Sequence, residues 1–256
     1  MDFKNKVVAI TGAGTGIGKA TARALHAAGA AVVLNGRRED VLADTAREIS
    51  REGERVAILA GDISLPKTGL ELAATAKRRF GGLDVLVNAA GIFQPLPFTA
   101  HTEETFDGYV RTILKGTFFA TQAAVPLLEE RGGGSIVNVG SMWAMQAIGA
   151  TPSAAYSAAK AGVHALTKNL AIELAAKKVR VNTVAPGVVE TPVYESFVPR
   201  DQLAATLASF NAFHPLGRVG QASDLASAIV FLASDASSWI TGTILPVDGG
   251  IMAGRN

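Results

Sequence analysis

The chain contains no cysteine at all, and it is poor in aromatic and charged residues. Aromatic residues make up 6% and charged residues 18% of its 256 positions. Without cysteine there is no disulfide, no thiolate metal ligand and no cysteine nucleophile. No uncharged apolar run approaches the ~18 residues of a membrane span, and the stretch after Lys6 is too short for a signal peptide. We therefore expect a soluble, cytoplasmic protein.

The charge balance offers little to a nucleic acid. The net charge is +2, and the densest basic clusters, 77–79 and 177–180, lie in segments with helical patterning. Such clusters are typical of a solvated helix face. The four histidines lie far apart and do not pair with carboxylates at ligand spacing, so we expect no metal site. The chain is 48% hydrophobic, which excludes disorder and allows a sizeable core.

Short apolar runs alternate with longer amphipathic stretches along the whole chain. Continuous apolar strands separated by helices are typical of a parallel sheet covered on both faces. The sequence therefore predicts an α/β fold: a single Rossmann-type, doubly wound domain over 1–256 with a seven-stranded parallel sheet flanked by helices. The expected strands are 7–11, 31–35, 55–60, 85–88, 135–139, 179–184 and 243–247, and the expected helices are 16–29, 38–52, 66–80, 102–130, 152–177, 200–212 and 222–234.

A glycine-rich segment follows the first expected strand and opens the first expected helix. It reads Gly-x-x-x-Gly-x-Gly at Gly12, Gly16 and Gly18. A pyrophosphate needs backbone N–H groups close to it and a helix N-terminus aimed at it, and side chains would obstruct that approach. A flexible turn is the alternative, but the placement at a strand-to-helix junction favours nucleotide binding.

This glycine spacing resembles the short-chain dehydrogenase/reductase family, in its compact single-domain branch. Further motifs occur in family order over residues 5–250: Asn-Ala-Ala-Gly at 88–91, Tyr-Ser-Ala-Ala-Lys at 156–160, Pro-Gly at 186–187 and Val-Asp-Gly-Gly at 247–250. The resemblance implies an oxidoreductase that uses NAD or NADP and assembles as a homotetramer, with helices 102–130 and 152–177 at the interface. It also implies a cofactor site formed by Gly12, Thr15, Gly16, Ile17, Gly18, Arg37, Asp62, Ile63, Asn88, Ala89, Gly91, Tyr156, Lys160, Pro186, Gly187, Val189 and Thr191.

Tyr156 and Lys160 lie four residues apart on an expected helix, so their side chains share one face. A phenol titrates near ~10, and a nearby ammonium together with a nicotinamide cation favours the phenolate. We expect the pKa of Tyr156 to fall, which suits a general acid and base. The resemblance implies that Ser141, at the end of the fifth strand, binds the substrate oxygen, although its spacing to Tyr156 is slightly longer than is usual in the family.

The residues after the second strand bear on the choice of cofactor. An NAD site wants a carboxylate at this strand end, whereas the 2′-phosphate of NADP needs cations. Gly36 stands where NAD-dependent family members carry aspartate, and Arg37 and Arg38 follow. A guanidinium suits phosphate, so we expect NADP(H) to be preferred, with NAD(H) possible; arginines solvated at a helix start are the alternative.

One position departs from the family pattern. Ile113 stands where the family has an asparagine, three residues before Gly116. In the family that residue kinks the helix and holds a water linked to the lysine. Isoleucine has no polar side-chain atom, so either the proton relay runs through backbone carbonyls and water, or activity is impaired.

The region 190–217 corresponds to the family's substrate lid. We expect the small-molecule alcohol or carbonyl substrate to lie among Phe93, Trp143, Gln146, Tyr194, Phe213 and His214, although aromatic residues at helical spacing are also typical of a core. Together these features favour an NADP(H)-preferring oxidoreductase that interconverts a secondary alcohol and a carbonyl compound. A dinucleotide-binding protein with lost or regulatory function, and an epimerase or lyase on the same fold, remain open.

Overall fold

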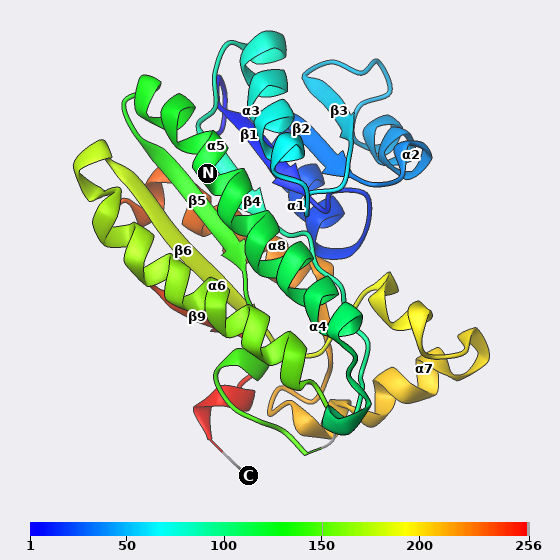
Figure 1. Cartoon of the computed structure of the whole chain (residues 1–256). Helices are drawn as coiled ribbons and strands as arrows, with labels where there is room; N and C mark the ends of the chain where they lie inside the picture. Colours follow the sequence, from blue (N-terminus) through cyan, green and yellow to red (C-terminus); the bar gives the residue numbers. More distant parts are fainter. Residues whose placement is uncertain (150, 255–256) are drawn as a thin grey trace.

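A fully parallel sheet of seven strands forms the centre of the molecule (Figure 1). The computed structural model describes residues 1–149 and 151–254. The strand order is β3-β2-β1-β4-β5-β6-β9, which confirms the predicted fold class. Each strand lies within two residues of its expected bounds: β1 (Val7–Thr11), β2 (Ala31–Gly36), β3 (Val56–Ala60), β4 (Val85–Asn88), β5 (Gly134–Val139), β6 (Val179–Pro186) and β9 (Ile244–Val247).

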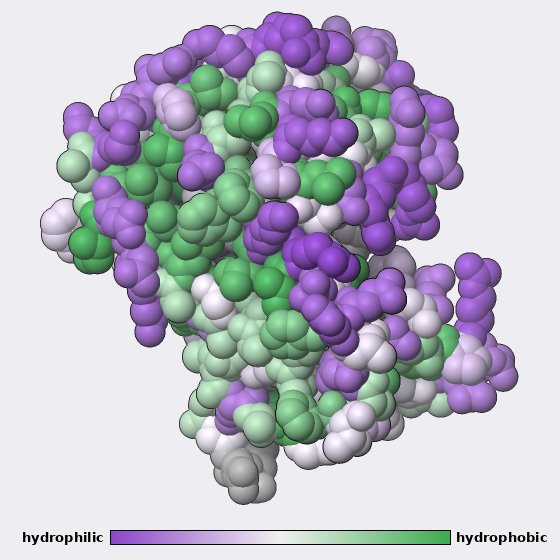
Figure 2. All heavy atoms as spheres, in the orientation of Figure 1, coloured by the Kyte–Doolittle hydropathy of each residue, from purple (hydrophilic) through white to green (hydrophobic). Residues whose placement is uncertain are grey.

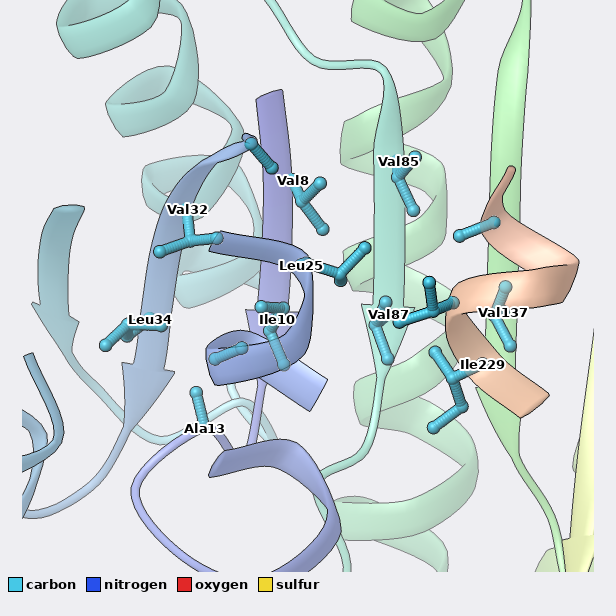
Figure 3. Packing of buried hydrophobic residues seen from close by; sticks show 14 of the residues in the cluster. Val8, Ile10, Ala13, Leu25, Val32, Leu34, Val85, Val87, Val137 and Ile229 are labelled. Atoms are coloured by element: carbon cyan, nitrogen blue, oxygen red, sulfur yellow. The ribbon is translucent and has the colours of Figure 1, made fainter. Parts of the chain in front are cut away.

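Helices cover both faces of the sheet, and the alternation of side chains along β1 shows why. Val8 and Ile10 pack into one apolar cluster with α1 (Gly16–Ala27), α2 (Glu39–Ile49) and α8 (Ala222–Ala233) (Figure 3). Val7 and Ala9 point to the opposite face and its cluster with α3 (Pro66–Phe80), α5 (Gly116–Glu130) and α6 (Ala154–Glu173). Because both faces are buried, the strands are continuously apolar rather than alternating.

The helix expected over 102–130 has an irregular centre. It begins with α4 (Glu103–Tyr109), whose first turn is capped by a reciprocal pair of hydrogen bonds between Thr102 and Thr105. It then widens into a π-helical segment, η2 (Val110–Lys115), before continuing as α5. Such π segments inside α-helices are frequent at functional sites, and this one packs against α6.

The segment between β6 and α8 forms an arm that extends from the body of the molecule beside the carboxyl ends of the strands (Figure 1). It carries a small parallel pair of strands that the sequence did not predict, because two-residue strands have no apolar period to detect. Figure 2 shows a notch between this arm and the half of the molecule that carries β1, β2 and β3. The arm contains β7 (Val189–Glu190), η5 (Pro192–Ser196), α7 (Arg200–Ser209), η6 (Asn211–Phe213) and β8 (Gly220–Gln221).

Short 3-10 turns complete the described chain at η1 (Phe98–Ala100), η3 (Met142–Ala144), η4 (Ala175–Lys177), η7 (Asp235–Ser237) and η8 (Ile251–Ala253). Within the described ranges, none of the helices combines the length and the apolar character that crossing a bilayer requires.

Candidate active site

The glycine loop lies at the carboxyl end of β1, where each of its three motif glycines has a separate steric reason. Gly12 has a φ of +65°, and a Cβ there would lie 2.8 Å from the backbone of Ala90. Gly16 also has a positive φ, of +52°. A Cβ on Gly18 would lie 2.3 Å from the carbonyl oxygen of Gly12. The loop therefore keeps its backbone bare and close to β4, as an approaching pyrophosphate requires.

The first turn of α1 is free to meet an anion. It contains no acidic residue, and Thr15 at its N-cap makes no side-chain capping bond within the described chain. The N–H groups at this end of the helix carry the positive end of its dipole. The Thr11 hydroxyl accepts hydrogen bonds from the backbone N–H groups of Ala89 and Ala90, both at 3.1 Å, and so ties the β1 and β4 ends together. These features fit the diphosphate of a nicotinamide dinucleotide.

The residues expected to meet the adenosine end of such a cofactor lie at the ends of β2 and β3. The Asn35 amide donates to the carbonyl oxygens of Leu59 and Gly61 and joins the two strand ends. Arg37 is exposed and forms no ion pair with the described carboxylates, so its guanidinium is free to meet a phosphate. Asp62 accepts from the N–H of Ser64 at 2.9 Å, and Ile63 beside it is buried.

The ribose side is built around Asn88 and Gly91. The buried Asn88 amide donates to Thr121 and to Asn138, which in turn donates to Thr167, and this chain of bonds fixes the end of β4. A Cβ on Gly91 would lie 3.8 Å from the Lys160 ammonium. The loop after β4 and the helix α6 therefore meet where the nicotinamide ribose is expected.

The segment after β6 closes the same site from the other side. A Cβ on Gly187, which follows Pro186, would lie 3.1 Å from the backbone of Asp248. Val189 is buried, and the Thr191 hydroxyl donates to its carbonyl oxygen. The Thr191 methyl group lies 3.2 Å from the position of a Cβ on Gly16. The arm thus starts directly over the glycine loop, next to Ile17.

Ser141, Tyr156 and Lys160 meet beyond the carboxyl end of β5. Lys160 lies one helical turn after Tyr156 on α6, with its Nζ 5.8 Å from the centre of the phenol ring. It is 5% exposed and donates to the carbonyl oxygen of Val139 at 2.5 Å. Ser141 is 3% exposed, and its Oγ accepts from the N–H of Trp143 at 3.2 Å, which starts the 3-10 turn η3.

Burial dominates the electrostatics of this group. It raises the pKa of Tyr156 to about 12, against a smaller lowering by the Ser141 hydroxyl. It also lowers the pKa of Lys160 to about 8. In the protein alone the pKa of Tyr156 is thus raised and not lowered, because the cost of burying a phenolate exceeds the effect of its neighbours. The lowering expected from a bound nicotinamide cation stays a prediction.

Ile113 lies in the π segment and is 1% exposed. It packs with Tyr109, Ala155, Ala159 and Val163 in an apolar cluster beneath the Tyr156 ring. The helix therefore widens here without the family's asparagine. Isoleucine offers Lys160 no side-chain amide from this position, and the lysine donates to the backbone carbonyl of Val139.

The sequence did not point to two neighbours of Ser141, Tyr156 and Lys160. His164 is buried, and its Nε2 accepts from the N–H of Ser141 at 3.3 Å. Burial and the charges of Lys160 and Lys168 lower its pKa to about 4, so the neutral ring holds this backbone position. The spacing of four from Lys160 was the available signal. Tyr109 donates its hydroxyl to the carbonyl oxygen of Gln94 at 2.6 Å and lies edge-on to Tyr156.

Aromatic side chains form a wall over Tyr156. The Phe93 ring lies 4.8 Å from the Tyr156 ring, 5.6 Å from Phe197 and 6.4 Å from Trp143, measured between ring centres. Tyr194 joins the wall through Phe197, at 5.6 Å. The long β5–α6 connection, the loop after β4 and the arm thus meet at one place.

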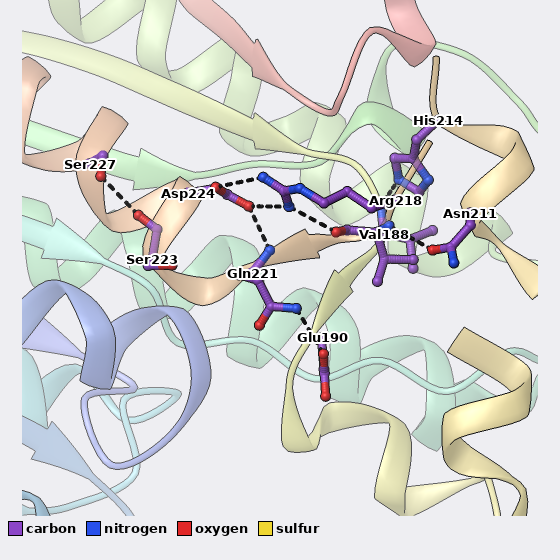
Figure 4. A network of polar contacts seen from close by, with 10 residues as sticks. Val188, Glu190, Asn211, His214, Arg218, Gln221, Ser223, Asp224 and Ser227 are labelled. Carbon is purple, nitrogen blue, oxygen red and sulfur yellow. Dashed lines mark hydrogen bonds and ion pairs between the residues drawn. The ribbon is translucent and has the colours of Figure 1, made fainter. Parts of the chain in front are cut away.

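The other expected pocket residues have different positions. Gln146 is exposed, and its backbone N–H donates to Met142. His214 is buried with both ring nitrogens bonded to backbone, Nε2 accepting from Val188 and Nδ1 donating to Phe210, so it anchors the arm and is not available to a substrate (Figure 4). Phe213 lines a cavity behind Trp143. Among the described residues, no three histidine, aspartate or glutamate side chains gather as metal ligands.

The sheet is parallel and carries a bare glycine loop at the end of β1. A partly buried tyrosine and a buried lysine lie beyond the end of β5. Together these features define a class of dinucleotide-dependent enzymes. The family model described as enoyl-(acyl carrier protein) reductase matches residues 12–252. The chain belongs to the short-chain dehydrogenase/reductase family and is an NAD(P)-dependent oxidoreductase.

Relatives align over nearly the whole chain. It is 40% identical over 252 residues to the cis-4-hydroxycyclohexanecarboxylate dehydrogenase of Sinomonas cyclohexanicum, covering 98% of each protein. It is 38% identical over 252 residues to the 3alpha-hydroxysteroid dehydrogenase of Mediterraneibacter gnavus, covering 97% of this chain and 98% of the other. The crystal structure of a short-chain type dehydrogenase/reductase from Mycobacterium marinum superposes with a TM-score of 0.91 at 34% identity, over 99% of this chain and 98% of the other.

Proposed function

We propose that this protein is an NADP(H)-preferring oxidoreductase that interconverts a secondary alcohol and a ketone, with Tyr156 as its general acid and base. The observation that carries the proposal is the meeting of Tyr156, Lys160 and Ser141 beside Gly91, at the strand ends that also hold the glycine loop. When bound, the nicotinamide ring supplies or accepts the hydride. The remaining chemistry belongs to the side chains.

Each side chain of the group has one task in this proposal. The Ser141 hydroxyl binds the substrate oxygen and stabilises negative charge developing on it. The Tyr156 phenol transfers the proton. With a pKa near 12 it is protonated at neutral pH, which is the form that donates to a carbonyl oxygen. The protonated phenol is the form that the proposed reduction of a carbonyl group requires.

Lys160 holds the cofactor ribose and favours the phenolate when the proton has left Tyr156. Its ammonium lies against Gly91 and keeps one donor engaged with the Val139 carbonyl, leaving two for other partners. The cofactor site is proposed to be lined by the glycine loop, by the residues after β2, β3 and β4 described above, and by the segment from Pro186 to Thr191.

Arg37 is proposed to select NADP(H) by pairing with the 2′-phosphate. We would titrate the protein with NADPH and NADH while following nicotinamide fluorescence, with Arg37→Ala and, as a matched control, Arg79→Ala. Arg79 is also exposed, but it lies in the last turn of α3, near the amino ends of the strands and away from the site. We expect NADPH to bind more tightly than NADH, and Arg37→Ala to remove about 1–3 kcal/mol of that preference. Equal binding of both cofactors would overturn the assignment of Arg37 but leave the oxidoreductase.

A second candidate is a dinucleotide-binding protein without efficient turnover, and the buried Ile113 is the observation that favours it. The apolar cluster around Ile113 separates Lys160 from the helix face where the family carries its polar relay. Cofactor binding without reduction of any ketone in a broad panel would select this candidate.

The proposed assembly is a homotetramer. Helices α5 and α6 present apolar side chains to solvent, among them Phe118 at 43% and Ile172 at 79% exposure, and Figure 2 shows a largely apolar surface over these helices. Association would remove this surface from water. Light scattering of the purified protein tests the state directly. We propose the cytoplasm as the location, because cellular NADP(H) is supplied there.

A further inference from the structure

A cavity of about 380 Å³ lies against Trp143, which also belongs to the aromatic wall. Its volume falls within the range of about 300–1,000 Å³ that is typical of small-molecule pockets. The β5–α6 connection and the end of α7 with η6 supply its walls, which consist of Trp143, Ile148, Thr151, Ser209, Phe210 and Phe213.

Trp143 links the cavity wall to the residues around Tyr156 and Ser141. The backbone N–H of Trp143 donates to the Ser141 hydroxyl, and its ring lies 6.4 Å from Phe93, which contacts Tyr156. Trp143 thus belongs both to the cavity wall and to the aromatic group around Tyr156. The extended spacing between Ser141 and Tyr156 supplies the loop that forms one wall.

The chemistry of the walls restricts what fits there. None of the six lining residues is ionisable at neutral pH. The Ser209 hydroxyl already donates to the carbonyl oxygen of Thr206 at 2.7 Å. Burying a carboxylate or ammonium here would leave it without a partner of opposite charge, which costs several kcal/mol.

One residue of the cavity wall carries a polar atom that has no partner among the described residues. The indole Nε1 of Trp143 is shielded from solvent and makes no hydrogen bond with the described residues. An unsatisfied buried donor costs about 1–3 kcal/mol. An acceptor oxygen on a ligand seated against the Trp143 ring would offset that cost.

We propose that this cavity is the distal substrate subsite, and that it holds the neutral ring system of a cyclic secondary alcohol or ketone carrying an acceptor for the Trp143 N–H. This inference rests on the proposed function for the position of the reacting carbon. It separates this protein from a relative such as the Sinomonas enzyme, whose named substrate carries a carboxylate.

Trp143 can serve as a fluorescent reporter of this subsite, because the chain has only one other tryptophan, Trp239, which is not among the lining residues. Trp239 is 99% exposed. The variant Trp239→Phe leaves Trp143 as the sole indole, and Trp143→Phe is the matched control that leaves only Trp239. We would titrate both, saturated with NADP⁺, with three ketones: methyl 4-oxocyclohexanecarboxylate, 4-methylcyclohexanone and 4-oxocyclohexanecarboxylate.

We expect a saturable change of Trp143 fluorescence with both neutral ketones. The ester should bind about three- to tenfold more tightly than 4-methylcyclohexanone, because only the ester offers an acceptor. The carboxylate should bind at least about tenfold more weakly than the ester. The absence of a saturable change, an equal change in Trp143→Phe, or carboxylate binding as tight as ester binding would overturn the proposal.

Turnover separates this proposal from the one on which it rests. NADPH oxidation with the three ketones should follow the same order, and Trp143→Phe should reduce the ratio of kcat/KM for the ester over 4-methylcyclohexanone about three- to tenfold. Reduction of the ketones without a response from Trp143 would overturn the subsite and support the oxidoreductase. A saturable change of Trp143 fluorescence without reduction of any ketone would support the subsite and overturn the proposed ketone reduction.

Discussion

Replacing Lys160 by methionine should stabilise the protein while removing its activity. Burial lowers the pKa of Lys160 from its usual 10.5 to about 8. At about 1.4 kcal/mol per pH unit, the charged lysine costs the folded state about 3 kcal/mol at pH 7. Methionine has a similar length and no charge, but it loses the hydrogen bond to the Val139 carbonyl, which contributes about 1 kcal/mol. The net expectation is a gain of about 2 kcal/mol at pH 7.

The gain should disappear at alkaline pH. Between the folded pKa of about 8 and the unfolded value of 10.5, the unfolded chain binds more protons than the folded one, so wild-type stability rises with pH in this window. By pH 9.5 the cost of the buried charge has fallen by about 2 kcal/mol, and Lys160→Met and the wild type should be nearly equal.

Urea unfolding at pH 7 and pH 9.5 measures the difference in free energy of unfolding between Lys160→Met and the wild type at each pH. Lys168→Met is the matched control, since Lys168 lies two turns further along α6 and is exposed. Its stability should differ little from that of the wild type at either pH. Two results would refute the reasoning that burial destabilises the charged lysine. One is a Lys160→Met protein that is less stable than the wild type at pH 7, and the other is a gain in the free energy of unfolding that is the same at both pH values.

Three further predictions concern Gly18 in the glycine loop, His164 beside Ser141, and Asp84 at the amino ends of the strands. Gly18→Ala places a Cβ 2.3 Å from the Gly12 carbonyl, so NADPH binding should weaken at least about tenfold, whereas Gly108→Ala, which meets only ordinary contacts, should leave it unchanged. The pKa of His164 is lowered to about 4, so acidification from pH 6.5 towards 4 should destabilise the fold, and His164→Gln should flatten this part of the pH–stability curve; an unaltered curve would speak against it. Asp84→Asn weakens the bonds to Val7 and Arg131, so it should cost about 1–3 kcal/mol in urea unfolding without changing NADPH affinity, with the exposed Asp44→Asn as its neutral counterpart.

The architecture was predictable from sequence because its signals are local and strong. β1 is buried along its whole length, and its apolar run and the glycines after it mark a strand, a tight turn and a helix start without tertiary information. The two-residue strands β7 and β8 have no such signal. Their pairing depends on how the arm packs against the sheet.

The proximity of Tyr156 and Lys160 was predictable from the sequence, but the electrostatics around them were not. The family motifs identify Tyr156 and Lys160, and helical spacing places them on one face. The direction of the pKa shift of Tyr156 depends on how completely the Phe93 wall and the cluster around Ile113 enclose it, which no local pattern encodes. The π segment at Val110–Lys115 likewise forms around an isoleucine where the family motif has an amide.

The removal of a single oxygen atom tests the central claim most directly. Tyr156→Phe keeps the ring that packs against Phe93 and deletes only the hydroxyl proposed to move the proton. We would measure NADPH-dependent reduction of a panel of cyclic ketones by this variant and the wild type, alongside NADPH binding by fluorescence. The account predicts that the wild type reduces at least one ketone and that the variant loses about 10²–10⁴-fold in rate with cofactor affinity retained. Equal rates in the two proteins would contradict it.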